Sequence, residues 1–311
     1  MKNLNAIPLF IAVGESANLT LAAGRLGLSA SAVSKAVSRL EEEIGQRLVN
    51  RTTRRITLTE EGAIFLEHCR QVVAGVADAE AAVAYTRSAP RGRLRVQMPV
   101  GFGRIIVAPT LGEFTRRYPE LILDIEQSDR VFDIASEGKD AIICIGDPAD
   151  SRVVARKLCD LRFITCASPD YLARHGVPCV PEDLVRHRCL GYLIPPAGHY
   201  RDWRFERDGQ PLEMTISGTL NINSTESLLD ATIAGAGIAQ MATFVAADAV
   251  RAGKLKIVLR EFVPAVGPSV SVVYLPNKHM SPRIRAFIDF MITLVPEAPP
   301  WDTILEPERS A

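Results

Sequence analysis

The distribution of proline is the feature that most constrains how this 311-residue chain folds. Pro8 is followed by no proline until Pro90, and the other nineteen prolines all lie from Pro90 onward. Because proline breaks a helix from within, this proline-free stretch, rich in Ala, Leu, Arg and Glu, predicts a largely helical N-terminal part. The proline-containing remainder predicts a mixture of strands, turns and helices. Residues 88–92, Ser-Ala-Pro-Arg-Gly, lie between the two parts and are typical of a linker.

The composition is that of a globular protein, with 47% hydrophobic and 23% charged residues. The length suggests two domains or three. No apolar run reaches the ~18 residues that a membrane span needs. The apolar start of the chain only faintly imitates a signal peptide, because Pro8 and Glu15 interrupt it and no small-residue cleavage site follows. We therefore expect a cytoplasmic protein without a membrane partner.

The six cysteines include no C-x-x-C pair, which argues against a zinc ribbon and a thioredoxin-like motif. The histidines are scattered without H-E-x-x-H spacing, and neither a G-x-S-x-G motif nor a P-loop occurs. We therefore expect free thiols, no cofactor and no metal, and we assign no catalytic residue.

Charge is distributed unevenly although the net charge is zero. Residues 1–60 hold eight of the 36 Lys and Arg residues but only five of the 36 Asp and Glu residues. A basic N-terminal part is thus joined to a slightly acidic remainder. Nucleic acid is a candidate partner for the first part only.

Within the basic part, capping residues predict two helices joined by a tight turn. Thr20 is the expected cap of a helix over residues 21–26, Gly27 and Leu28 form the turn, and Ser29 is the expected cap of a second helix. In this second helix one stripe is apolar at three- and four-residue spacing: Val33, Val37, Leu40 and Ile44. The opposite face then carries Ser31, Ser34, Lys35, Ser38 and Glu42. Small hydroxyls and a lysine suit close approach to DNA, although a plain solvated helix face fits the same pattern.

A cluster of arginines follows this helix pair. Arg47, Arg51, Arg54 and Arg55 surround a polar stretch flanked by strand-like residues 48–49 and 56–58. This pattern predicts a hairpin with a basic tip that lies along a phosphate backbone as a wing.

Residues 4–62 resemble the winged helix-turn-helix of LysR-type transcriptional regulators. The resemblance rests on residues 20–29, on residues 32–37 with Leu40 and Glu41, and on residues 51–54 leading to 58–62. Ala30 departs from the pattern, since the family often has glutamine there. The resemblance implies double-stranded DNA as partner, with contacts from Thr20, Ser29, Ser31, Ser34, Lys35, Ser38, Arg39, Arg51, Thr52, Thr53 and Arg54.

A long helix is expected from Thr59, its predicted cap, with Glu60 and Glu61 in the first turn. Apolar residues then repeat with the four-three spacing of a coiled-coil seam: Phe65, Cys69, Val72, Val76, Ala79 and Val83. Some 28 residues span roughly 40 Å, which favours a partner helix over a core helix within one chain. The resemblance implies that this helix pairs two subunits, in a dimer or a tetramer.

Beyond the linker, strand-like and helical runs alternate. Strands are expected at residues 94–98, 122–125 and 141–145, with helices near 105–117 and 132–137, a βαβαβ pattern with a parallel or mixed sheet. Residues 92–295 resemble the effector domain of the same family, two α/β lobes related to periplasmic binding proteins. The implied domains are 1–59 for DNA binding, 60–91 for the linker helix, 92–163 with 268–295 for lobe I, 164–267 for lobe II, and a tail at 296–311.

Candidate effector contacts follow from the rule that open parallel sheets bind ligands beyond the carboxyl ends of their strands. The segments that meet this rule contain Val100, Gly101, Phe102, Ser128, Ile145, Gly146, Asn223, Ser224 and Thr225. Two of these segments open helices, so free backbone N–H groups there would suit a small carboxylate or another anion. Two departures from the family pattern occur, because many members have arginine at Cys144 and a leucine-proline pair where this chain has Gln240-Met241-Ala242.

The sequence thus predicts a DNA-binding regulator whose binding is modulated by a small-molecule effector, and which contacts RNA polymerase if it activates. Three alternatives stay open. An NAD(P)-dependent oxidoreductase is suggested by Gly101-Phe102-Gly103 after a strand, but Ile106 occupies the third glycine position of that fingerprint. A thiol-based redox regulator and a DNA-binding architectural protein without a ligand are the others.

Overall fold

The computed structural model describes residues 6–51, 56–83, 89–130, 138–148, 152–194, 199–216, 218, 220–264, 267–276 and 281–306. The chain forms two compact units. The first contains Met1–Ser88, and the second contains Ala89–Ile134 and Lys139–Ala311. In the described part no helix combines the length and the apolar character that a membrane crossing requires.

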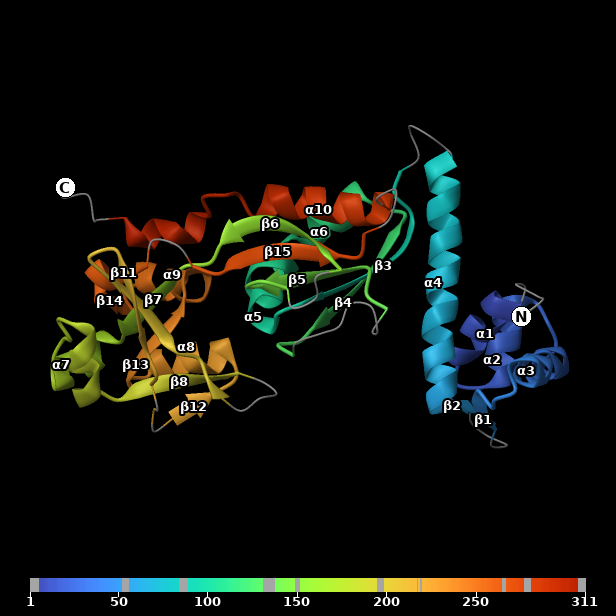
Figure 1. The fold of residues 1–311 in the computed structure, drawn as a ribbon, viewed down its shortest axis with the longest axis horizontal. Coiled ribbons are helices and arrows are strands. Elements are labelled where there is room, and N and C mark those ends of the chain that lie inside the picture. The colour runs from blue at the N-terminus through green and yellow to red at the C-terminus, as the bar shows by residue number, and fades with distance from the viewer. Residues whose placement is uncertain are drawn as a thin grey trace. The chain divides into compact units, whose positions relative to one another are not determined.

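The N-terminal unit is a helical bundle with a small hairpin. Its elements are α1 (Ala6–Gly14), α2 (Leu19–Leu26), α3 (Ala30–Ile44), β1 (Val49–Arg51), β2 (Ile56–Leu58) and α4 (Glu60–Val83) (Figure 1). Phe10, Val33 and Leu48 are at most 1% exposed and lie at the centre of its core. Burying side chains of this size contributes roughly 1.5–3 kcal/mol each, which fixes the three short helices against one another.

The caps of α2 and α3 correct one expectation and confirm another. Asn18, not Thr20, caps α2: its Oδ1 accepts from the N–H of Leu21 at 2.9 Å. The helix starts at Leu19 because Asn18 is also a strong capping residue, and Thr20 becomes an exposed residue of its first turn. Ser29 caps α3 as predicted, with Oγ accepting from the N–H of Ala32 at 3.2 Å.

The C-terminal unit contains two mixed sheets, one in each lobe. The sheet of lobe I has the order β4-β3-β5-β15-β6, in which β3 is parallel to β4 and β5 while β15 is antiparallel to β5 and β6. Its strands are β3 (Gly92–Met98), β4 (Leu121–Gln127), β5 (Ala141–Ile145), β6 (Val154–Asp160) and β15 (Ser269–Tyr274). The predicted mixed sheet is therefore confirmed, whereas the helix expected at 132–137 lies outside the described residues.

Helices cover the sheet of lobe I. Residues 100–117 form one helical run of α5 (Val100–Phe102), a π turn (Gly103–Val107), a 3₁₀ turn (Ala108–Thr110) and α6 (Leu111–Arg117), and α10 (Pro282–Leu294) lies along the same lobe (Figure 1). Phe114 of α6 packs edge-on against Phe287 and Phe290 of α10.

The sheet of lobe II has the order β12-β8-β13-β7-β14, with β8 parallel to β12 and β13. Its strands are β7 (Phe163–Ala167), β8 (Cys189–Ile194), β12 (Leu220–Ile222), β13 (Ile238–Ala242) and β14 (Lys256–Val258), with β9 (His199–Tyr200) beside β8. Helices α7 (Pro169–His175), α8 (Thr225–Ile233) and α9 (Thr243–Arg251), and a separate hairpin of β10 (Trp203–Arg207) and β11 (Gln210–Met214), complete the lobe. Short 3₁₀ helices lie at Pro181–Arg186 and Arg260–Phe262.

Part of the expected tail at 296–311 packs against lobe II. Residues Pro300–Leu305 form a 3₁₀ helix against α9, where Trp301 is 8% exposed and contacts the ring of Phe244. The hydroxyl of Thr243 donates to Asp302. Phe244 also packs against Phe102 of lobe I at 5.8 Å, so the two lobes share one core.

Candidate functional site

One face of α3 is buried in the interior, and the opposite face is exposed. Val33, Val37 and Leu40 are at most 2% exposed, as their spacing predicts, and Ile44 is partly buried. Three residues of the predicted contact set are exposed on the opposite side: Ser31, Lys35 and Arg39. Ser34 and Ser38 are only half-exposed, and the hydroxyl of Ser38 donates to the carbonyl of Ser34 at 3.2 Å. Of the contacts predicted on α3, these exposed three are therefore the most accessible to a partner.

The N-terminus of α3 holds no charged capping group. Its first turn contains no acidic residue, and the cap Ser29 is neutral, with its hydroxyl 3.0 Å from that of Ser31. The partial positive charge of the helix end is therefore not cancelled within the first turn, which suits a phosphate.

The predicted wing is present as a hairpin. Val49 pairs with Leu58 and Arg51 pairs with Ile56 in an antiparallel register. Its expected DNA contacts Thr52, Thr53 and Arg54 lie outside the described residues, as does the side chain of Arg51. The sequence did not reveal how the hairpin is fixed: Oε1 of Glu41, on α3, accepts from the N–H groups of Leu48 and Val49 at 2.9 and 3.0 Å.

The start of α4 is packed tightly against residues 47–48, which precede β1. Oγ1 of Thr59 accepts from the N–H of Gly62 at 3.0 Å and its hydroxyl donates to the carbonyl of Arg47 at 2.8 Å, which confirms the predicted cap. A Cβ on Gly62 would lie 1.9 Å from the carbonyl oxygen of Leu48. This close approach explains why a glycine occupies the first turn of the helix.

The apolar seam of α4 serves two different purposes. Phe65 stacks edge-on against Phe10 at 5.2 Å and Cys69 is 2% exposed, so these two positions belong to the core of their own unit. Val72 and Val76 are 45% and 55% exposed, as are the neighbouring Ile64 and Val73 at 56% and 42%. The side chains of Ala79 and Val83 lie outside the described set. The single seam that the spacing predicted is thus partly internal and partly uncovered.

In lobe I the helix N-terminus expected to hold an anion is capped by the chain itself. The N–H of Val100 donates to Oδ1 of Asp129 at 3.0 Å, so this N–H is not free. Ser128, which follows β4, is held by its N–H to the carbonyl of Met98 at 3.0 Å. At the end of β5, the N–H of Gly146 donates to the carbonyl of Ser269 at 2.7 Å, which ties Ile145 and Gly146 to β15. The expectation of free N–H groups at residue 100 is wrong, because an acidic side chain one strand away supplies the cap.

The second expected helix N-terminus, that of α8, is also capped by residues of the chain itself. Ser224 caps it, with Oγ accepting from the N–H of Ser227 at 3.2 Å, and Asn223 before it is exposed. The carboxylate of Glu226 accepts from the hydroxyls of Ser224 and Thr225 at 3.1 and 3.2 Å. The signal that sequence reasoning missed is the acidic residue in the first turn of α8.

The two helix ends lie close together, one in each lobe. Nε of Arg104, from lobe I, donates to Oε1 of Glu226, from lobe II, at 2.9 Å. Gly101 lies so close to α8 that a Cβ there would be 2.5 Å from Oγ1 of Thr225. Phe102 is buried beside them in the shared core.

Two carboxylates of this region, those of Asp129 and Glu226, have shifted pKa values. Burial raises the pKa of Asp129, the N–H of Val100 opposes this effect, and the negative charge of Glu226 adds to it. Burial also raises the pKa of Glu226, but hydrogen bonds from Arg104, its own N–H and the Ser224 and Thr225 hydroxyls outweigh burial, so that its pKa is lowered. Glu226 is thus held as the charged form, whereas Asp129 is pushed toward the neutral form.

The cysteines are poorly suited to sensing oxidants in this conformation. Burial raises the pKa of Cys159 and Cys166 to about 12 and that of Cys69 and Cys189 to about 11. Burial also raises the pKa of the partly buried Cys144, while Cys179 is exposed. Because the thiolate is the reactive form, nothing here favours the thiol-based alternative. In the described part of the chain no cluster of His, Cys, Asp or Glu has the arrangement of a metal site.

Comparison with protein families decides the class of this protein. Residues 4–63 match the model of the bacterial regulatory helix-turn-helix protein of the lysR family, and residues 87–295 match the LysR substrate binding domain. The chain belongs to the LysR family of transcriptional regulators. The family assignment excludes the oxidoreductase alternative, because the relatives are transcriptional regulators and not enzymes.

Relatives of this LysR-type regulator match it over nearly the whole length. An HTH-type transcriptional regulator of Xanthomonas campestris pv. campestris is 35% identical over 94% of this chain and 85% of its own length. An HTH-type transcriptional repressor of Pseudomonas aeruginosa is 34% identical over 96% of this chain and 94% of its own. The solved structure of CrgA, a LysR-type transcriptional regulator from Neisseria meningitidis, has a TM-score of 0.62 and 32% identity over 96% of this chain and all of that one.

Proposed function

We propose that this LysR-type regulator binds double-stranded DNA through α3 and the wing, and that a small-molecule effector between lobes I and II modulates that binding. The observation that carries the DNA-binding part is the outward face of α3. Ser31, Lys35 and Arg39 are exposed there, while the helix end beside them has no acidic residue in its first turn. A helix face with a small hydroxyl, two cations and an uncancelled positive end fits the major groove of DNA.

The assembly proposed for this chain is a dimer through α4, with a tetramer as the larger form. Val72, Val73 and Val76 leave an apolar side of α4 uncovered in the single chain. A second α4 would bury this side and would present two copies of α3 to a pseudo-symmetric DNA site. Contact with RNA polymerase belongs to the proposal only if the protein activates transcription.

The effector proposed is a small carboxylate or another anion held where the lobes meet. Support comes from the contact of Gly101 with Thr225 and the ion pair of Arg104 with Glu226, which place both lobes at one location. A ligand there would shift the equilibrium between two lobe arrangements by its difference in affinity for them.

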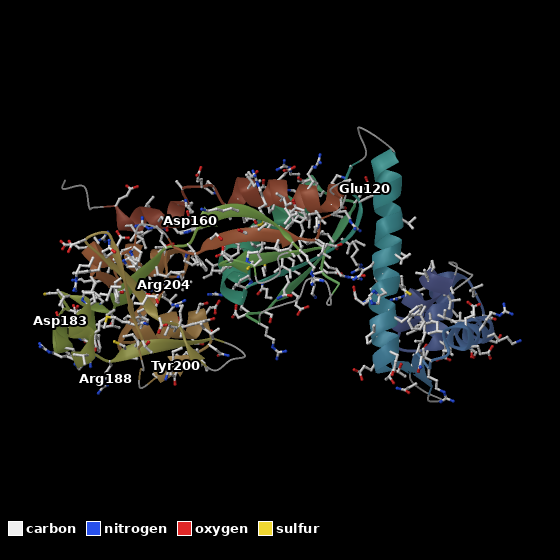
Figure 2. All side chains as sticks on the ribbon, in the orientation of Figure 1. Glu120, Asp160, Asp183, Arg188, Tyr200 and Arg204 are labelled. Carbon is white, nitrogen blue, oxygen red and sulfur yellow. The ribbon has the colours of Figure 1, made fainter. Side chains whose placement is uncertain are left out.

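The DNA-binding part is tested by the salt dependence of binding. Selection from a randomised duplex library supplies the DNA, and fluorescence anisotropy at several salt concentrations gives the affinity. For Lys35→Ala and Arg39→Ala we expect weaker binding, with the slope of log K against log salt reduced by roughly 0.9 for each lost phosphate contact. Arg204→Ala is the matched control, because Arg204 is an exposed arginine of the other unit (Figure 2). Unchanged slopes in both α3 variants, or no salt-sensitive binding by the parent protein, would contradict the proposal.

A further inference from the structure

One arginine of lobe II has unusual surroundings. Arg201 lies between β9 and β10, next to the labelled Tyr200 in Figure 2, and is partly buried. The carbon of its guanidinium is 4.4 Å from the ring centre of Phe163 and 5.0 Å from that of Tyr192. Nη2 donates to the carbonyl of Gln240 at 2.7 Å, whereas Nε is buried and has no hydrogen-bond partner among the described residues.

The charge of Arg201 is not balanced by a carboxylate in the described part of the chain. Its electrostatic neighbours are Tyr192 and the positive Arg204, and burial lowers its pKa to about 10. The side chain therefore stays protonated at neutral pH. Two aromatic faces offset part of the cost of burying this cation, but an unpaired Nε–H in the interior remains unfavourable. By contrast, Arg204 has its own partner, with Nε 3.0 Å from Oε1 of Glu213.

Arg201 also lies at the sheet edge where ligands of such folds bind. Its N–H donates to the carbonyl of Tyr192 at 2.9 Å, in the carboxyl-terminal half of β8, which is parallel to β12 and β13 and pairs with β9 in antiparallel register. The pKa of Tyr192 is raised to about 12 by burial and next by the charge of Asp129 in lobe I, while Arg201 lowers it. Tyr192 thus interacts both with the guanidinium of Arg201, 5.0 Å from its ring centre, and with the charge of Asp129 in lobe I.

A buried glutamine holds the segment that carries Arg201. Oε1 of Gln240 accepts from the N–H of Arg204 at 3.0 Å, and Nε2 donates to the carbonyl of Arg204 at 3.0 Å. These bonds, together with that from Nη2 of Arg201, tie residues 201–204 to β13.

From these observations we infer that Arg201 is the carboxylate-binding residue of the effector site and that the effector is a small organic carboxylate. The inference rests on the proposed function and names its ligand class. A ligand carboxylate supplies the counter-charge that Arg201 lacks, and it does so in lobe II instead of at the helix ends, whose N–H groups and hydroxyls already contact Asp129 and Glu226. Arg201 would then be retained for binding, at some cost to the stability of the ligand-free protein.

The test uses formate as the smallest carboxylate and follows unfolding of the full chain by tryptophan fluorescence. Both tryptophans, Trp203 and Trp301, lie in the C-terminal unit, so the signal reports that unit alone. The melting temperature is measured as formate replaces chloride at constant ionic strength, with sulfate as a parallel series. We expect a saturable rise with formate in the parent protein and in Arg204→Ala, and no formate-specific rise in Arg201→Met. We further expect Arg201→Met in chloride to melt no lower than the parent.

Equal rises in the parent and in Arg201→Met, or a rise with sulfate but none with formate, would overturn the inference. So would a parent protein that does not distinguish formate from chloride. If Arg201→Met does not fold, Arg201→Lys decides, because it keeps the charge but loses the planar fork; its apparent formate affinity is expected to fall at least tenfold. DNA binding of each variant is measured separately by anisotropy. Formate stabilisation through Arg201 without any effect on DNA binding would refute the proposed modulation but leave this inference standing.

Discussion

The N-terminus of α3 and the helix N-termini in the C-terminal unit differ in the side chains that cap them. The first turn of α3 has no acidic residue, and its cap is the neutral Ser29. In lobe I the N–H of Val100 is capped by Asp129, and in lobe II the hydroxyls that open α8 contact Glu226. A helix end is thus available to an external anion only where the chain has not supplied its own.

The largest effect is expected when α3 is given the acidic first turn that α8 has. For Ser31→Glu we expect the helix to be stabilised slightly, because a carboxylate near a helix N-terminus is favourable. DNA affinity at fixed salt is expected to fall by roughly 100-fold, since a like charge facing phosphates costs several kcal/mol. Anisotropy with a selected duplex measures the loss, and Ser227→Glu in the first turn of α8 is the control. A Ser31→Glu protein that bound DNA as tightly as the parent would place the DNA elsewhere than at this helix end.

A smaller effect is expected when the carboxylate is removed from α8. Glu226→Gln loses the ion pair with Arg104, whose side chain is 55% exposed and therefore well screened. We expect the free energy of unfolding of the C-terminal unit to fall by about 0.5 kcal/mol. Tryptophan fluorescence in urea measures this change. Asp248→Asn is the control, because Asp248 pairs with Arg251 while 99% exposed and its loss should change nothing measurable. Equal effects of the two substitutions would show that the cross-lobe pair has no special role.

The smallest effect concerns Asp129 and is visible only as a dependence on pH. Burial raises the pKa of Asp129 in the folded protein above its ordinary value of 3.8, so the charged form disfavours folding. The stability of Asp129→Asn relative to the parent should therefore rise as pH increases from 3.8 through the folded-state pKa and then stay level. Below 3.8 this contribution vanishes, because the carboxyl is protonated in both states. Melting curves of both proteins, recorded about every half pH unit between roughly pH 3.5 and 8, measure this difference in stability. A difference that did not vary with pH would exclude the Asp129 carboxyl as its source.

Local patterns in the sequence predicted the DNA-binding unit well. The spacing of Val33, Val37 and Leu40 fixed which side of α3 is buried, and Ser29 fixed where that helix begins. These signals work because partners three or four residues apart are set by helix geometry alone. The error at Thr20 arose where two good capping residues, Asn18 and Thr20, stand two positions apart, and local propensity does not separate them.

The candidate effector site was predicted less completely, because its contacts join distant segments. The sequence located the helix ends at Val100 and Ser224, and the structure brings them to one place. It did not indicate that Asp129 or Glu226 would satisfy those ends. The sequence also did not indicate that Trp301, in the expected tail, would pack against Phe244.

By itself the sequence determined that this protein has a helix-turn-helix with an apolar inner face, a hairpin after it and an α/β unit beyond a linker, since each of these follows from spacing and turn chemistry within a few residues. The division of that unit into two lobes was implied by the family resemblance. Only the tertiary structure decided which charges meet. Arg104 and Glu226 are 122 residues apart, and Arg201 meets Gln240 across 39 residues. Such pairs form through sheet order and lobe packing, which bring side chains together without leaving a periodic signal in either segment.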